Sequence, residues 1–205
     1  MLAFVAGAQA SAHRKDELLQ AARLGIALDR VRIDLDLTPG IAVADAVLAD
    51  IDADRNGSVS RDEGLRYASR VLSEIRLDVD GRPLDLRMGD SEFPPVDDVR
   101  RGEGTIRMAL TAPTGTLDGG VHTLHYRNAH RPDIGVYLAN ALVPATDRIA
   151  ITSQDRDAEQ RGLSVGFEVR SEPVLHVSRW AATGGVAVLL ALVLACHRYW
   201  RAYRS

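Results

Sequence analysis

The chain has 205 residues, of which 46% are hydrophobic, 28 are acidic and 25 are basic. This composition provides for one domain with a real core, and its slight acidity argues against nucleic acid as a partner. The one cysteine, Cys196, leaves no disulfide in the chain.

The first twelve residues have features of a secretory signal. An apolar run at 2–8 is followed by Ala10-Ser11-Ala12, a small-x-small pattern typical of a signal-peptidase site. No positively charged region precedes the run, so we interpret residues 1–12 as a truncated signal-like segment. An unprocessed, irregular helix is the alternative. We expect an extracytoplasmic domain over residues 13–178.

A strand and a helix are predicted next. Residues 31–37 alternate between apolar and polar side chains, which is typical of a half-buried strand. Thr38 and Pro39 fit a helix N-cap followed by a first-turn proline. One face of the helix that follows is apolar, with Ala44, Val47, Leu48 and Ile51.

Residues 52–63 match a twelve-residue pattern in which oxygens at alternate positions converge on a calcium ion. Gly57 stands at the sixth position, where the chain turns sharply and glycine avoids strain. Val59, at the eighth position, is expected to enter the core behind the loop. The predicted oxygen ligands of Ca²⁺ are Asp52, Asp54, Asn56, Ser58 through its carbonyl, and Glu63, with Ser60 acting through a water.

The same segment also has an interpretation without a metal. Asp-rich and Asn-Gly-containing segments form ordinary turns, and Ser60 and Glu63 fit a helix capping box. Neither accounts for the alternating acidic and amide side chains ahead of Gly57, so the calcium loop is the favoured prediction.

An apolar stripe after the loop indicates a second amphipathic helix, with Leu65, Ala68, Leu72 and Ile75. Over residues 39–76 the chain therefore resembles the EF-hand superfamily. This resemblance implies a helix–loop–helix with a single calcium site.

Between residues 77 and 169 the pattern is that of short strands. Segments 105–110, 123–127, 136–142, 149–152 and 163–169 have strand character, and 77–86 fits a hairpin around Asp80-Gly81. Residues 87–104 are polar and rich in turn residues, so a long loop is expected there. The predicted fold class is α+β, an antiparallel β-sandwich-like domain with the EF-hand inserted between its first and second strands.

Residues 179–198 predict one C-terminal transmembrane helix. Residues 180–197 carry no formal charge when histidine is neutral, and a helix of that length spans roughly 27 Å, close to a hydrocarbon core. Trp180 and Trp200 lie at opposite edges, as interfacial aromatics do. The tail at 199–205 has arginines and no acid, so the positive-inside rule places it in the cytoplasm and the domain in the periplasm.

Three histidines, His122, His125 and His130, form the other candidate metal site. On a strand, His122 and His125 would point to opposite faces, so hydrogen-bonded or solvated histidines are favoured over a transition-metal site. No phosphate-binding loop, nucleophile elbow or zinc-ligand spacing is present in the sequence, so no enzymatic activity is expected.

The layout also resembles a group of exported, membrane-anchored bacterial proteins with one EF-hand, on the strength of residues 36–40, 52–63 and 119–124. It has a looser likeness to extracytoplasmic regions of nickel/cobalt permease-like proteins. We expect a single-pass, extracytoplasmic calcium-binding protein with a mainly structural ion and an unknown protein partner. The alternatives are an accessory to nickel or cobalt transport and a β-sandwich adhesion or scaffold module.

Overall fold

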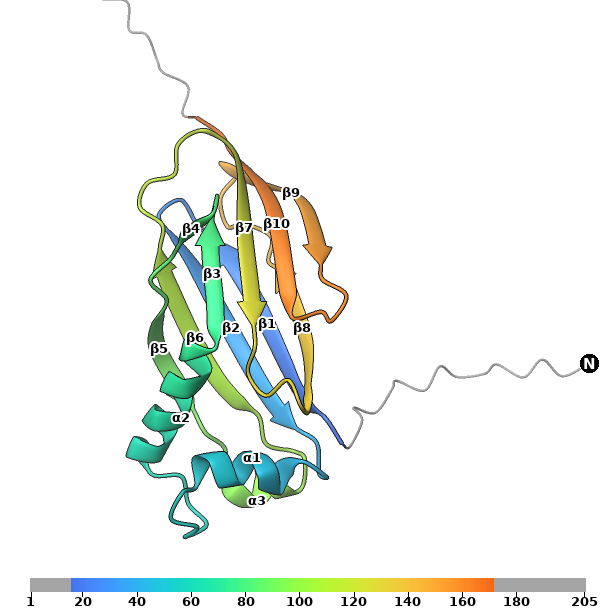
Figure 1. Ribbon diagram of the computed structural model, residues 1–205. Helices are drawn as coiled ribbons and strands as arrows, with labels where there is room; N and C mark the ends of the chain where they lie inside the picture. The colour runs from blue at the N-terminus through green and yellow to red at the C-terminus, as the bar shows by residue number, and fades with distance from the viewer. Residues whose placement is uncertain (1–15, 172–205) are drawn as a thin grey trace, which may run out of the picture. The chain divides into compact units, whose positions relative to one another are not determined.

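The computed structural model describes residues 16–171, which form a mixed α+β structure with two mostly antiparallel, five-stranded sheets (Figure 1). Across the first sheet the strands are β5 (Arg87–Glu92), β6 (Ile106–Pro113), β2 (Arg30–Pro39), β1 (Leu18–Ile26) and β8 (Gly135–Ala141). Across the second sheet they are β4 (Arg82–Pro83), β3 (Ile75–Val79), β7 (Gly120–Asn128), β10 (Gly162–Val169) and β9 (Ile149–Arg156).

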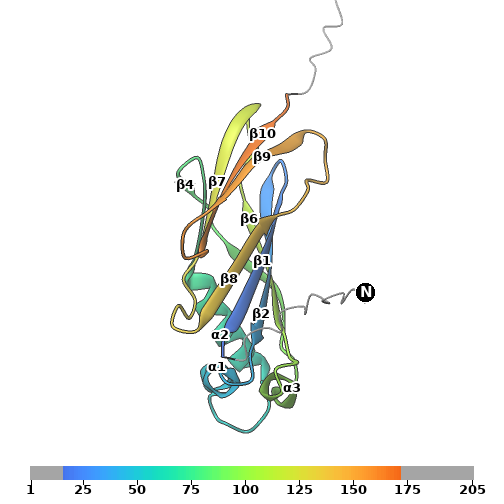
Figure 2. The same ribbon diagram turned by 90° about the vertical axis from the view of Figure 1, so that its right-hand side faces the viewer.

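Alternating side chains from both sheets bury one hydrophobic core between the two layers, which Figure 2 shows nearly edge-on. In β6, Ile106, Met108 and Leu110 are buried, whereas Arg107 between them is exposed. Fully burying one such apolar side chain contributes about 1.5–3 kcal/mol, so this alternation fixes which face of each strand points inward.

Strand β1 is absent from the sequence prediction. Its inward-facing positions include Gln20 and Ala22, which interrupt the apolar alternation that marks the other strands. In the structure β1 pairs antiparallel with β2 and parallel with β8, so that Leu18 lies opposite both Pro39 and Gly135. The two long helices are therefore inserted between the second and third strands, and the predicted position between the first and second is wrong.

Helices α1 (Ala44–Ile51) and α2 (Arg61–Ser73) lie at the end of the sheets where β2 ends (Figure 1). The predicted apolar face of α1 is confirmed, with Ala44, Val47, Leu48 and Ile51 all buried. The predicted helix start at Thr38 and Pro39 is wrong, because both residues belong to β2 and Thr38 is paired with Leu19. Helix α1 begins five residues later and has no side-chain cap.

Helix α2 buries part of the predicted apolar face, because Ala68 is buried and Leu72 packs against the core. Its buried side chains are Glu63, Gly64, Tyr67, Ala68 and Val71. Leu65 is 46% exposed, and Ile75 already belongs to β3. Phe93 packs closely on Gly64, where an added Cβ would lie 2.9 Å from the ring.

Residues 87–104 are not the long loop that their polarity predicts. They contain β5, whose pairing with β6 has a register shift between Met88 and Ser91, and the short helix α3 (Val96–Arg100). Val96 and Val99 pack against Ala44 and Leu48, so α3 lies beside α1, as Figure 2 shows.

The signal-like segment at 1–12, the predicted transmembrane helix at 179–198 and the tail at 199–205 lie outside the described residues. Within residues 16–171, no helix combines the length and the apolar character needed to cross a membrane.

Candidate metal centre

Three carboxylates converge between α1 and α2. Asp52, Asp54 and Glu63 each place an oxygen within 4.8 Å of the other two, and this is the only such group of potential metal-binding side chains in the described part of the chain. Asp52 and Glu63 are buried, whereas Asp54 is exposed. Hard cations such as Ca²⁺ and Mg²⁺ prefer an all-oxygen set of this kind.

Backbone amides hold the first half of the loop around Asp52. Its Oδ1 accepts a hydrogen bond from Asn56 N at 3.1 Å, and its Oδ2 accepts one from Gly57 N at 3.0 Å. Gly57 has φ +81°, a left-handed conformation that favours glycine. The turn predicted from the sixth loop position is thus formed, and it directs two N–H groups back at the Asp52 carboxylate.

Asp54 and Asn56 are linked to each other in the same turn. The Asn56 side-chain amide donates to Asp54 Oδ2 at 2.8 Å, and Ser58 N donates to Asn56 Oδ1 at 2.8 Å. These contacts hold the Asn56 side-chain amide beside the Asp54 carboxylate, while the Asn56 Oδ1 stays bonded within the turn.

Glu63 joins the two ends of the loop. Its Oε1 accepts from Ala53 N at 2.9 Å, while its Oε2 accepts from Ser60 N at 3.0 Å and from the Ser60 hydroxyl at 2.6 Å. Glu63 N in turn donates to Ser60 Oγ at 3.3 Å, which completes the capping box. These hydrogen bonds, led by the Ser60 hydroxyl, lower the pKa of Glu63 to about 2, so the group is an anion at neutral pH.

Val59 ties the loop to the interior, as its sequence position predicts. It is partly buried and packs both against the main core and against the small cluster of Ala44, Leu48, Val96 and Val99. The side chain therefore fixes the loop at the point where the two clusters meet.

A buried polar network that sequence reasoning missed connects α2 to both sheets. His130, only 1% exposed, has Nε2 3.0 Å from the Tyr67 hydroxyl and Nδ1 2.6 Å from Glu74 Oε2. Its carbonyl accepts from Gln20 Nε2 at 2.7 Å, and Asn128 Nδ2 donates to Gln20 Oε1 at 2.9 Å. The one signal in the sequence is a polar residue, Gln20, at an inward-facing strand position.

The protonation of His130 follows from these partners. A carboxylate only accepts hydrogen bonds, so the Nδ1 of His130 is protonated and donates a hydrogen bond to Glu74. The Nε2 of His130 then accepts a hydrogen bond from the Tyr67 hydroxyl. Burial lowers the pKa of His130, although Glu74 acts in the opposite direction. The ring is therefore a neutral structural link between α2 and the segment after β7.

Asp50, near the C-terminal end of α1, joins the two helices to that same segment. Its carboxylate accepts from Arg70 of α2 at 3.1 Å and from Arg131 at 2.6 Å. Arg131 also forms an ion pair with Asp133 at 3.0 Å. The helix–loop–helix is thus attached to the sheets by polar contacts next to the apolar ones.

The structure does not bring the three candidate histidines together. His122 lies 2.8 Å from Asp80 and stacks on Phe167, while His125 faces outward and contacts Ser164 at 2.9 Å. The Asp80 hydrogen bond raises the pKa of His122, and that of Asp80 is lowered by the same contact. The opposite orientation of His122 and His125 agrees with the strand geometry, and each of the three histidines has its own hydrogen-bond partner.

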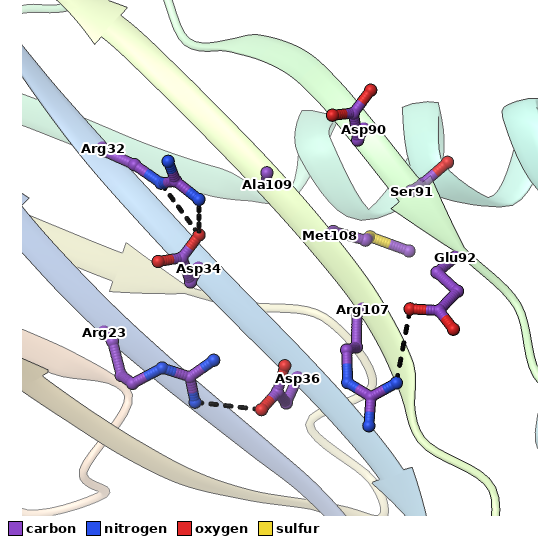
Figure 3. Close-up of a pocket in the computed structure, with 10 residues that line it drawn as sticks. All are labelled: Arg23, Arg32, Asp34, Asp36, Asp90, Ser91, Glu92, Arg107, Met108 and Ala109. Carbon is purple, nitrogen blue, oxygen red and sulfur yellow. Dashed lines mark hydrogen bonds and ion pairs between the residues drawn. The ribbon is translucent and has the colours of Figure 1, made fainter.

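A charged hollow of about 310 Å³ lies on the outer face of the first sheet (Figure 3). Its side chains are largely paired with one another, as in the Arg23–Asp36 contact at 2.9 Å and the Arg107–Glu92 contact at 3.3 Å. Arg32 and Asp34, both on β2, are paired as well. The hollow is a surface ion-pair array and offers weaker grounds for a site than the carboxylates of the loop.

Comparison of the chain with protein-family models, curated proteins and solved structures finds no match.

Proposed function

We propose that this chain is a calcium-binding protein and that α1, residues 52–63 and α2 form an EF-hand inserted in an antiparallel β-sandwich. The observation that carries the proposal is the convergence of Asp52, Asp54 and Glu63 within 4.8 Å, around a turn closed by Gly57. The remaining oxygens would come from Asn56, the Ser58 carbonyl and a water on Ser60.

The carboxylates are already arranged by the protein. Asp52 is fixed by two backbone amides, and Glu63 is held at both ends of the loop. A preformed site loses less conformational freedom on binding than a disordered one. We infer a mainly structural ion that fastens the start of α2 to the end of α1.

A single hand with three carboxylates suits modest affinity. Extracellular calcium modules bind at about 10⁻⁴ to 10⁻³ M, and we propose that this site falls in that range. Such an affinity fits a periplasmic domain held by a single C-terminal transmembrane helix at 179–198, which remains part of the proposal.

The alternative of a nickel or cobalt accessory receives less support. That function calls for nitrogen ligands on one ion, but His122, His125 and His130 are each hydrogen-bonded elsewhere. An adhesion or scaffold role for the sandwich is compatible with a structural ion, and no feature of the described residues favours it.

Calorimetric titration of the full-length protein in detergent with CaCl₂ tests the proposal. We expect one site with a Kd of about 10⁻⁴ to 10⁻³ M, abolished in Asp52→Ala. The matched control is Asp62→Asn, which removes an exposed acid from the same loop outside the proposed ligand set. Absence of calcium binding in the unaltered protein, or equal loss in both variants, would refute the assignment.

A further inference from the structure

The segment between β8 and β9 lies at the end of the sheets from which β10 leaves the domain. Ile149, the first residue of β9, is paired with Val169, and Arg170 N donates to the Arg148 carbonyl at 2.7 Å. Figure 1 shows that the helices lie at the opposite end. We call residues 142–148 the apical loop.

The apical loop exposes apolar side chains that a loop in water normally does not contain. Val143 is 93% exposed and Leu142 is 41% exposed. They border a hollow of about 470 Å³ that is also lined by Pro144, Ile149 and Ile151. The backbone of the loop is nevertheless anchored, because Leu142 N donates to the Leu24 carbonyl at 2.8 Å.

Basic side chains stand beside this apolar surface. Arg170 donates through Nη1 to the Asp147 carbonyl at 2.7 Å and is exposed, and Arg148 is half-buried next to it. One acidic side chain, Asp147, lies in the loop itself. Apolar tips flanked by arginine suit the boundary between lipid headgroups and acyl chains.

The length of chain after β10 limits how far this end can be from a membrane. The predicted transmembrane segment begins at residue 179, eight positions after Ser171, and eight extended residues span at most about 29 Å. The inference thus rests on the proposed anchor. With that anchor in a bilayer, the end bearing the apical loop stays near the lipid surface.

We propose that the apical loop docks on the phospholipid bilayer, with Leu142 and Val143 entering the interface and the exposed Arg170 facing lipid phosphates. This contact sets the orientation of the domain. The loop at 52–63 then faces away from the membrane, toward the extracytoplasmic space.

Site-specific fluorescence quenching of the full-length protein tests the docking. In a Cys196→Ser background, Val143→Cys is labelled with an environment-sensitive dye and reconstituted in phosphatidylethanolamine–phosphatidylglycerol vesicles. The control is Ser69→Cys, an exposed position on α2 at the far end. We expect nitroxide-labelled lipid to quench the dye at 143 at least about fivefold more strongly than at 69, because interfacial side chains enter about 5–10 Å into the headgroup region.

The outcomes separate the docking from the proposed anchor and from calcium binding. Flotation with the vesicles but equal quenching at 143 and 69 would overturn the docking and leave the anchor standing. Failure of the labelled chains to float would overturn both, while the calorimetric calcium test is unaffected. Energy transfer between two copies labelled at 143, without quenching by nitroxide lipid, would assign the loop to a contact between copies and also overturn the proposal.

Discussion

Glu63→Gln separates the two roles that the Glu63 carboxylate has in the structure. The side chain caps α2 through Ser60 and is also one of the three converging carboxylates. Glutamine can serve in a capping box but cannot offer two anionic oxygens to a cation. We therefore expect the variant to fold with an intact α2 and to lose the stabilisation that calcium gives.

The size of the calcium effect follows from mass action. With a Kd of 10⁻⁴ to 10⁻³ M, 10 mM calcium stabilises the folded state by about 1.4–2.7 kcal/mol. For a domain the size of residues 16–171 this raises the melting temperature by about 3–10 °C. The complementary variant, Ser60→Ala, removes the cap at a cost of about 1 kcal/mol and also the residue proposed to hold the bridging water. It leaves the three carboxylates in place, so it should keep most of the calcium shift.

Thermal unfolding followed by circular dichroism, with 10 mM calcium or with chelator, measures both variants against the unaltered protein. We expect the two variants to respond differently. Ser60→Ala should melt at a lower temperature than the unaltered protein under both conditions, but its melting temperature should still rise with calcium. Glu63→Gln should melt at the same temperature with and without the ion. A full calcium shift in Glu63→Gln, or no shift in the unaltered protein, would show that the carboxylate serves only as a cap.

Two further predictions concern the rest of the domain. Tyr67→Phe leaves the buried Nε2 of His130 without a hydrogen-bond partner and should cost about 1–3 kcal/mol in urea unfolding. Tyr126→Phe is its control and should cost much less, because among the described residues the Tyr126 hydroxyl has no partner, and equal losses would contradict the role of the hydrogen bond. The raised pKa of His122 and the lowered pKa of Asp80 predict that their contact stabilises most between pH 3.8 and 6.5, the ordinary values of the two groups. The stability advantage over His122→Gln should fall as the pH rises through the folded pKa of His122, and an advantage that is constant from pH 5.5 to 8.5 would refute it.

Most of the strands were predictable because the residue pattern that specifies them lies within a short stretch of sequence. The hairpin around Asp80-Gly81 and the paired segments at 149–152 and 163–169 combine alternation with turn residues, and both are confirmed. The turn and the capping box of the loop at 52–63 were equally predictable, since they depend on residues within twelve positions of one another.

The missed features depend on contacts between distant residues. Gln20 makes β1 look unlike a core strand, and its partners are Asn128, the last residue of β7, and His130 just after that strand. The burial of Leu65 in α2 was wrongly predicted, and Gly64, which has no side chain to mark it as buried, is the residue that receives Phe93. The apolar contacts of Val96 and Val99, which stabilise α3, are made with α1 and therefore exist only when α1 is folded.

The parallel pairing of β1 with β8 has a consequence for the order of folding. Gln20 and His130, which join these regions, are 110 residues apart in the chain. Closing so long a loop costs entropy before the contact is gained, and topologies rich in such contacts fold slowly. During synthesis β1 therefore waits, with the edge that pairs with β8 still open, until β8 has emerged.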